Sequence, residues 1–274
     1  MGRILRVDLS ARRTAVESLD PSISAKFIGG AGLGAWLLSQ QQHTELDPLA
    51  PENMIAFLTG PLAGTRIPGS DRYTVVARSP LTGIWGESDS GTFGARLKRA
   101  GYDALVITGQ ADIPTYLWIT DETIEFRDAA HLWGKDTYEI ESPIRAETHP
   151  QAEFVAIGPA GERLARIAAI MTNGRDGRAA ARCGLGAVMG SKKLKAIAVH
   201  GRLELQIAYP DGLISALKTQ VPRIRELRTS FTRYGSAGGI VAMEEIGDLP
   251  VKNWLGGNWA DGANAISGIT MVEK

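Results

Sequence analysis

The chain has 274 residues, and its 30 lysines and arginines balance 30 acidic residues. This length allows one large domain, or one domain and part of a second. A net charge near zero argues against generic binding to nucleic acid or to an anionic membrane surface, and the single cysteine, Cys183, excludes an internal disulfide and an all-cysteine metal site. The first residues lack the apolar stretch of a secretory signal and no apolar run is long enough to span a membrane, so we expect a cytoplasmic protein.

Strand patterns and short helices alternate along the first 201 residues. The patterns predict a hairpin over residues 3–19, a helical segment interrupted by glycines over 21–41, strands over 53–59 and 71–79, a short helix over 94–101 and a buried strand over 102–109. They then predict a hairpin over 115–129, a helix over 137–148, a strand over 152–158, a short helix over 186–193 and a strand over 194–201.

Part of this order occurs twice. Residues 94–109 and 186–201 both begin with Gly-Ala and continue through a short basic helix and an apolar strand to a closing glycine. Each is preceded by an apolar strand that ends in Gly-Pro, at Gly60 and at Gly158, so the two copies are offset by 98 residues there and by 92 residues at Gly-Ala. We interpret this as an internal duplication of a strand–loop–strand–loop–helix–strand unit, and predict an α+β fold with two related mixed β-sheets and short helices.

The region beyond Arg202 has a different character. Residues 210–235 predict a helix that Pro222 kinks or breaks, residues 238–247 predict another helix, and residues 248–268 have the composition of a loop. We therefore expect one domain over residues 1–205 and the beginning of a helical second domain over 206–274.

The long loop of each copy is rich in arginine. The first loop carries Arg66, Arg72 and Arg78, and the second carries Arg163, Arg166, Arg175, Arg178 and Arg182. Each loop leads through glycines into a helix start, where free N–H groups and guanidinium groups together favour phosphate. Two such sites would suit a ligand with two phosphates, and a solvated basic face is the alternative. The lysine pair that follows, Lys192 and Lys193, is predicted to face solvent on a short helix.

Other candidate motifs are weaker. Gly184, Gly186 and Gly190 resemble a dinucleotide-binding fingerprint, but they follow an arginine-rich loop instead of a strand. The four histidines, at positions 43, 131, 149 and 200, have no metal-binding spacing. Cys183 lies beside Arg182 and a predicted helix start, which together could lower its thiol pKa. The alternative is that Cys183 is a small buried packing residue.

Several of these segments together resemble a known family. "GRILRVDLS", "FIGGAGLGAWLL", "PENMIAFLTGPLAGT", "DRYTVVARSPLTG", "SGTFGARLKRAGYDALVITG" and "RAAARCGLGAVMGSKKLKAIAVHG" occur in the order found in the N-terminal domain of tungsten-containing aldehyde:ferredoxin oxidoreductases. The resemblance runs from residue 3 to about residue 201, and "LPVKNW" resembles the start of that family's second domain.

The resemblance implies a bis-pyranopterin cofactor that carries tungsten or molybdenum and whose two phosphates are joined by magnesium. The residues that it implies for cofactor binding are Arg72, Asp89, Gly91, Arg178, Ala179, Ala181 and Arg182. It also implies that the backbone carbonyls of Asp89 and Ala179 face the magnesium ion. No catalytic residue is assigned within this chain.

Three departures from the family pattern bear on these residues. Asp89 stands where the family more often has Asn, "SGTFG" is one residue shorter than usual, and Ala181 replaces a usual Gly. The chain also lacks the CxxCxxxC motif that holds the family's [4Fe–4S] cluster, which is expected only in a missing C-terminal part.

The sequence therefore favours the N-terminal part of an enzyme that oxidises aldehydes to carboxylates and passes electrons to ferredoxin or another electron-transfer subunit, with a homo-oligomer also open. This chain alone is expected to be inactive. The alternative is a stand-alone pterin- or phosphate-binding subunit without activity of its own.

Overall fold

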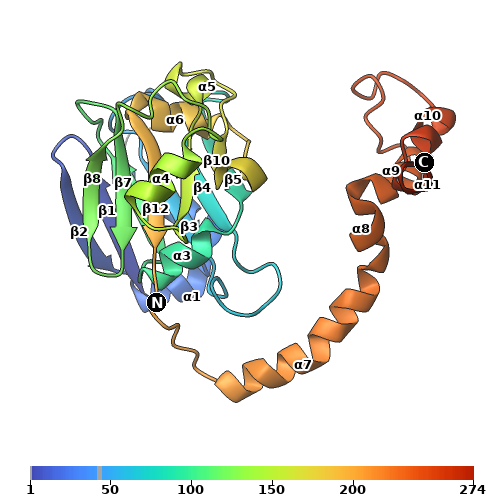
Figure 1. Ribbon diagram of the computed structural model, residues 1–274, viewed down its shortest axis with the longest axis horizontal. Helices are drawn as coiled ribbons and strands as arrows, with labels where there is room; N and C mark the ends of the chain where they lie inside the picture. Colours follow the sequence, from blue (N-terminus) through green and yellow to red (C-terminus); the bar gives the residue numbers. More distant parts are fainter. Residues whose placement is uncertain (1, 42–44) are drawn as a thin grey trace. The chain divides into compact units, whose positions relative to one another are not determined.

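The computed structural model describes residues 2–41 and 45–274, and the chain divides into two compact units, Met1–Gln206 and Ile207–Lys274 (Figure 1). His43 lies outside the described residues. Within the described residues every strand belongs to the first unit, and the second unit is helical.

The first unit is built on two six-stranded mixed sheets, with strand orders β2-β1-β6-β3-β4-β5 and β11-β10-β9-β12-β7-β8. The first sheet contains β1 (Arg3–Asp8), β2 (Arg13–Ser18), β3 (Ile55–Thr59), β4 (Tyr73–Arg78), β5 (Trp85–Ser90) and β6 (Ala104–Thr108). The second contains β7 (Thr115–Thr120), β8 (Ile124–Asp128), β9 (Glu153–Ala156), β10 (Ile170–Thr172), β11 (Arg178–Ala180) and β12 (Leu194–His200). The α+β architecture with two related sheets is thus confirmed.

Each sheet is one copy of the duplicated unit. The last strand of each copy, β6 or β12, pairs parallel with the first strand, β1 or β7, and antiparallel with β3 or β9. Ala104 pairs with Leu58 in the first copy and Ala196 pairs with Ala156 in the second, which reproduces the sequence offsets of 92 and 98 residues. The duplication also includes the opening hairpins β1–β2 and β7–β8, which the sequence comparison did not connect.

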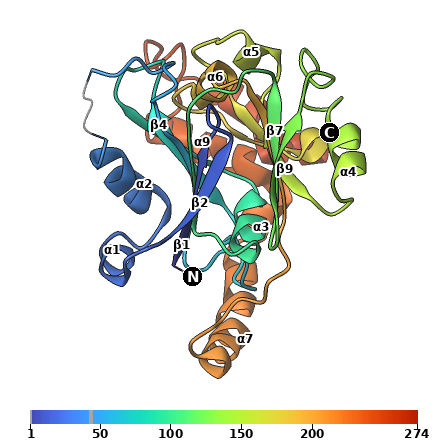
Figure 2. The same ribbon diagram turned by 90° about the vertical axis from the view of Figure 1, so that its left-hand side faces the viewer.

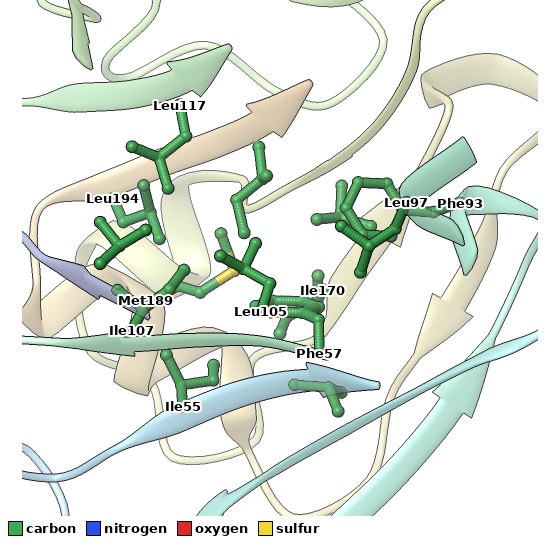
Figure 3. Close-up of a cluster of buried hydrophobic side chains, with 14 of the residues drawn as sticks. Ile55, Phe57, Phe93, Leu97, Leu105, Ile107, Leu117, Ile170, Met189 and Leu194 are labelled. Carbon is green, nitrogen blue, oxygen red and sulfur yellow. The ribbon is translucent and has the colours of Figure 1, made fainter. Parts of the chain in front are cut away.

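A shared hydrophobic core lies between the two sheets (Figure 3). Both sheets contribute fully buried side chains to it, among them Phe57 and Leu105 from the first and Leu117 and Ile170 from the second. Two short helices, α3 (Phe93–Arg99) and α6 (Leu185–Ser191), occupy equivalent places in the two copies and add Phe93, Leu97, Val188 and Met189 to the same core. Burial of this continuous apolar surface holds the two copies together.

Helices also cover the outer face of each sheet. Helices α1 (Pro21–Phe27) and α2 (Gly30–Ser39) lie outside the first sheet, where Leu33 and Leu37 pack with Leu58 (Figure 2). Helix α4 (Glu141–Glu147) packs its Ile144 against Phe154 on the outer face of the second sheet. The remaining helix of this unit, α5 (Pro159–Glu162), packs against α6.

Three lysines of the first unit are buried. Lys98 pairs with Asp103, and Lys195 pairs with Glu162. Lys192, which was predicted to face solvent, is fully buried, and that prediction was wrong. Its Nζ atom donates hydrogen bonds to the carbonyl oxygens of Pro51 at 2.8 Å and Gly109 at 3.2 Å, so it ties the second copy to the end of the first.

The second unit consists of short helices and one long helix. Its helical elements are α7 (Pro210–Leu227), α8 (Thr229–Tyr234), η2 (Gly235–Gly239), α9 (Ile240–Glu245), α10 (Ala260–Ala265) and α11 (Gly268–Glu273). Helix α7 continues through Pro222, so of the predicted kink or break, the break is absent. Helix α10 lies where a loop was expected. No helix in the described part of the chain is long and apolar enough to cross a membrane.

Three strands were not predicted from the sequence. β5, β10 and β11 all lie in the two arginine-rich segments that were interpreted as loops. β5 has six residues, of which three are Ser or Gly, and β10 and β11 have three residues each, so their local strand signal is weak. The helix expected over residues 137–148 is also shorter in the structure, where α4 begins at Glu141. Three of the seven predicted cofactor-binding residues lie on these strands, namely Asp89, Arg178 and Ala179.

Candidate cofactor site

The candidate site lies where the two sheets meet edge to edge. β5 is the last strand of the first sheet, β11 is the first strand of the second, and the two strands are in contact. Edge strands leave one row of backbone N–H and C=O groups outside their own sheet's ladder. Backbone groups from both copies therefore gather at one junction.

The two copies contact each other reciprocally at this junction. Gly91, just before α3, lies so close to Thr172 of β10 that a Cβ atom at position 91 would be 2.7 Å from the threonine side chain. Cys183, just before α6, lies in the same way against Gly86 of β5, where a Cβ atom would be 2.6 Å from the Cys183 Cβ. The turn that precedes the helix in each copy thus rests on the strand hairpin of the other copy.

Hydrogen bonds beneath the surface fix this arrangement. The Tyr73 hydroxyl lies 3.2 Å from Thr172 Oγ1, and Ser79 Oγ donates to the Cys183 carbonyl at 2.7 Å. The Arg182 backbone N–H donates to Ser88 Oγ at 3.3 Å. Burial raises the pKa of Tyr73 to about 12, so its hydroxyl stays protonated at neutral pH. All three contacts join one copy to the other.

The outward face of the junction holds the side chains that the sequence singled out. Along β5, side chains alternate, so that Trp85, Glu87 and Asp89 are exposed while the residues between them are buried. On the other side of the junction, the exposed residues are Arg178, Ala179, Ala181 and Arg182. The structure therefore brings exposed residues of both copies to two strands that are in contact, although they are about 90 residues apart in the chain.

Charge is distributed unequally over this surface. Arg72, which precedes β4, forms an ion pair with Asp89, with 2.6 Å between Nη1 and Oδ2. Among the side chains that the structure describes, no carboxylate lies within ion-pairing distance of Arg178 or Arg182. Among the predicted site residues, the second copy thus contributes two guanidinium groups without a carboxylate partner in the described side chains, and the first contributes Arg72, which is already paired.

The glycines at the helix starts do not have the predicted role. A Cβ atom at Gly94 would meet the carbonyl oxygens of Asp71 and Arg72, and one at Gly186 would meet those of Ala168 and Ala169. The Gly186 N–H already donates to the Ala168 carbonyl. These glycines permit close packing of backbone on backbone, so the two helix starts are not open anion sites.

The same observation weighs against a dinucleotide site at Gly184–Gly190. A Cβ atom at Gly184 would be 1.8 Å from the Arg166 carbonyl, and one at Gly190 would be 1.9 Å from the Gly161 carbonyl. At both glycines the space of a Cβ atom is filled by backbone, so both permit close backbone packing. Three residues of the site had escaped sequence analysis, namely Glu87, Ser88 and Thr172, and the alternation of "WGESDS" was the available signal for the first two.

Known proteins are similar to this chain in sequence and in fold. The family model described as the aldehyde ferredoxin oxidoreductase N-terminal domain matches residues 4–201. The chain belongs to this family. It is 44% identical over 261 residues to the tungsten-containing aldehyde ferredoxin oxidoreductase of Pyrococcus furiosus, which covers 93% of this chain and 43% of that protein. The same-named protein of Thermococcus kodakarensis is 42% identical over 278 residues, covering 100% of this chain and 46% of that protein.

Other members have different names. The aliphatic sulfonate oxidoreductase, WOR-like subunit, of Pyrococcus furiosus is 34% identical over 271 residues. A solved structure of the BamBC active-site complex of benzoyl coenzyme A reductase superposes with a TM-score of 0.79 at 36% identity, covering 82% of this chain and 34% of that chain. The chain spans less than half the length of the relatives it matches. The N-terminal fold therefore occurs in proteins whose names state different substrates.

The residues at the junction fit the cofactor that the family implies. Exposed guanidinium groups suit phosphate, and the backbone carbonyls of two edge strands are oxygen ligands of the kind that magnesium accepts. In the described part of the chain, no group of three or more His, Cys, Asp or Glu side chains could hold a metal ion. A metal held here by this unit would therefore depend on backbone oxygens and on the cofactor's own ligands.

Proposed function

We propose that this chain binds the phosphate arms of a bis-pyranopterin cofactor that carries tungsten or molybdenum, in an enzyme that oxidises aldehydes to carboxylates and passes electrons to ferredoxin. The observation that carries the proposal is the junction of β5 and β11, where arginines and edge-strand backbone from two related copies share one surface. A duplicated site of this kind suits a ligand with two similar halves.

Each residue has a defined part in the proposal. Arg178 and Arg182 bind phosphate oxygens through their guanidinium groups, and Arg72 does so on the side of the first copy. The small side chains Ala179 and Ala181 let the cofactor approach the backbone, whereas the side of Gly91 that a Cβ atom would occupy is already filled by Thr172. The carbonyl oxygens of Asp89 and Ala179 hold the magnesium ion between the phosphates.

The chain's contribution to catalysis is binding and electrostatics. The metal centre, when bound, supplies the two-electron redox chemistry. The reciprocal contacts of Gly91 with Thr172 and of Cys183 with Gly86 fix the junction of β5 and β11 before the cofactor binds. This lowers the entropy cost of ordering the junction on binding.

Substrate choice and electron transfer belong to the remainder of the enzyme in this proposal. The [4Fe–4S] cluster has no ligand set among the described residues, since they hold one cysteine and no cluster of metal-binding side chains. We therefore expect the 274-residue chain alone to leave aldehydes unoxidised.

Metal and pterin analysis of the complete protein tests the proposal. We expect tungsten or molybdenum together with two pterins per polypeptide, and a loss of pterin content of about tenfold or more in Arg182→Ala, because charge-assisted contacts to phosphate are lost. Arg13→Ala is the matched control, since Arg13 is an exposed arginine on β2 of the same unit. Full pterin content in Arg182→Ala and Arg178→Ala, or a protein without pterin, would contradict the proposal.

A further inference from the structure

The two halves of the junction differ in charge although they are related copies. The first copy places Glu87 and Asp89 on the exposed face of β5, with Arg72 paired to Asp89 and Arg78 opposite Trp85 on the same face. The second copy places Arg178 and Arg182 there, with only alanines between them. An anionic ligand therefore meets carboxylates on one side of the junction and unpaired guanidinium groups on the other.

The Arg72–Asp89 pair follows from the strand register. Asp89 of β5 lies opposite Thr74 of β4, and Arg72 is two residues before Thr74, so its side chain lies on the same face as Asp89. The guanidinium Nη1 and the carboxylate Oδ2 are 2.6 Å apart, and the two side chains are 69% and 48% exposed. The pair is thus formed at the surface, where a ligand phosphate would also reach Arg72.

From this geometry we infer that Asp89 is a specificity-determining residue that competes with the anionic ligand for Arg72. In the ligand-free protein the carboxylate holds the guanidinium group, and a phosphate must displace it or bind beside it. The second copy has no such competitor in its described side chains. Anion binding is therefore asymmetric, with the stronger contacts on the side of Arg178 and Arg182.

The expected size of the effect follows from the exposure of the pair. Exposed ion pairs contribute little to stability, so the release of Arg72 from Asp89 lowers ligand affinity by about fivefold at most. The carboxylate also repels an anion within the Debye length of roughly 10 Å, and this part weakens with added salt. Removing the charge at position 89 should thus strengthen anion binding by about threefold to tenfold at low salt.

The inference rests on the proposed function, because it takes Arg72 as a ligand contact. The test measures binding of inorganic pyrophosphate to the full chain by calorimetry, at low salt and with divalent metals removed. The variants are Asp89→Asn, Arg72→Ala, the double variant and Arg182→Ala. Glu17→Gln is the matched control, since Glu17 also forms an exposed pair, with Arg6 at 2.7 Å, on strands β1 and β2.

We expect Asp89→Asn to bind pyrophosphate about threefold to tenfold more tightly, and Glu17→Gln to bind as the unmodified chain does. Arg72→Ala should cost more affinity in the Asp89→Asn background than in the unmodified chain, because only there is the guanidinium group free for the ligand. Unchanged or weaker binding in Asp89→Asn, with a loss in Arg182→Ala, would overturn this inference and leave the proposed function standing. If neither the unmodified chain nor Asp89→Asn binds pyrophosphate, both are overturned.

Discussion

In each copy of the first unit, the residue before an equivalent alanine of the last strand belongs to a buried ion pair. This residue is acidic in the first copy and basic in the second. Asp103 directly precedes Ala104 at the start of β6 and pairs with Lys98 of α3. The equivalent position in the second copy is Lys195, which directly precedes Ala196 in β12 and pairs with Glu162 of α5. Both copies thus hold a paired charge at this position, although its sign differs, because a buried charge is tolerated when a partner compensates it.

The surroundings of the two pairs explain why both are stable. Asp103 accepts hydrogen bonds from the backbone N–H groups of Gly2 and Arg3. Burial raises the pKa of Asp103, but the contacts with Lys98 and these amides outweigh it and keep the pKa below its usual value. Lys195 donates to the Lys135 carbonyl at 2.8 Å, and burial lowers its pKa although Glu162 acts in the opposite direction.

Removing the carboxylate from either buried pair should lower the stability of the fold more than the other substitutions below. Asp103→Asn and Glu162→Gln each leave a buried ammonium group without its anion, so each should lower the free energy of unfolding by about 3–5 kcal/mol. Urea denaturation of the full chain measures this. Glu17→Gln, which breaks an exposed pair, should cost about 1 kcal/mol or less. A large loss in only one copy would show that the two pairs are not equivalent.

Lys192 should give the second copy a pH dependence that the first copy lacks. Its equivalent in the first copy is Ala100, and burial lowers the pKa of Lys192 to about 8. Between this value and the unfolded value of about 10.4 the unfolded chain binds more protons, so the free energy of unfolding should rise with pH by roughly 2–3 kcal/mol.

Denaturation midpoints between pH 8 and pH 10 check this expectation. Lys192→Met should lose most of the rise and keep the part that Lys195 contributes, since burial lowers the pKa of Lys195 as well, whereas Lys193→Met, which changes the more exposed neighbour, should keep all of it. An identical pH profile for the unmodified chain and Lys192→Met would show that the Lys192 amine does not have a lowered pKa.

Substitutions at the two glycines of the reciprocal contacts should lower the stability by a smaller amount, which should be similar for both. A methyl group at position 86 or 91 would overlap the side chain of Cys183 or Thr172, so Gly86→Ala and Gly91→Ala should each cost about 1–3 kcal/mol. Thermal unfolding checks this, and Gly60→Ala is the control because nothing lies within 4 Å of its added Cβ.

A second substitution separates this overlap from a general loss of stability. Cys183→Gly should restore most of the loss in Gly86→Ala, since it makes room and also suits the backbone at position 183, where φ is +63°. No recovery in the double variant would show that the contact between Gly86 and Cys183 does not set the packing of the junction.

Much of the fold was predictable because glycine and proline pairs mark strand ends and helix starts in the sequence. The repeated Gly-Pro and Gly-Ala pairs gave the duplication and its offsets, and these agree with the strand registers. The strands β5, β10 and β11 were missed because their residues have little intrinsic strand preference and are held by pairing with neighbours. Tertiary contacts also decided the place of Lys192, since nothing in "SKKLK" distinguishes a buried lysine from a solvated one.

The candidate site was predictable in its members but not in its geometry. Arg72, Asp89, Arg178 and Arg182 were singled out from the sequence, and all four are exposed on or beside strands of the junction between β5 and β11. The ion pair between Arg72 and Asp89 depends on the register of β4 and β5, which the sequence did not predict. The use of the helix-start glycines for backbone packing also became visible only in the folded chain.

The central claim is that both copies together bind one cofactor. Hydrogen exchange of the complete protein, compared with and without its cofactor, tests this most directly at residues 86–92 and 178–184. We expect the amides of both segments to become more protected from exchange when the cofactor is bound. Protection confined to one segment, or to neither, would contradict it.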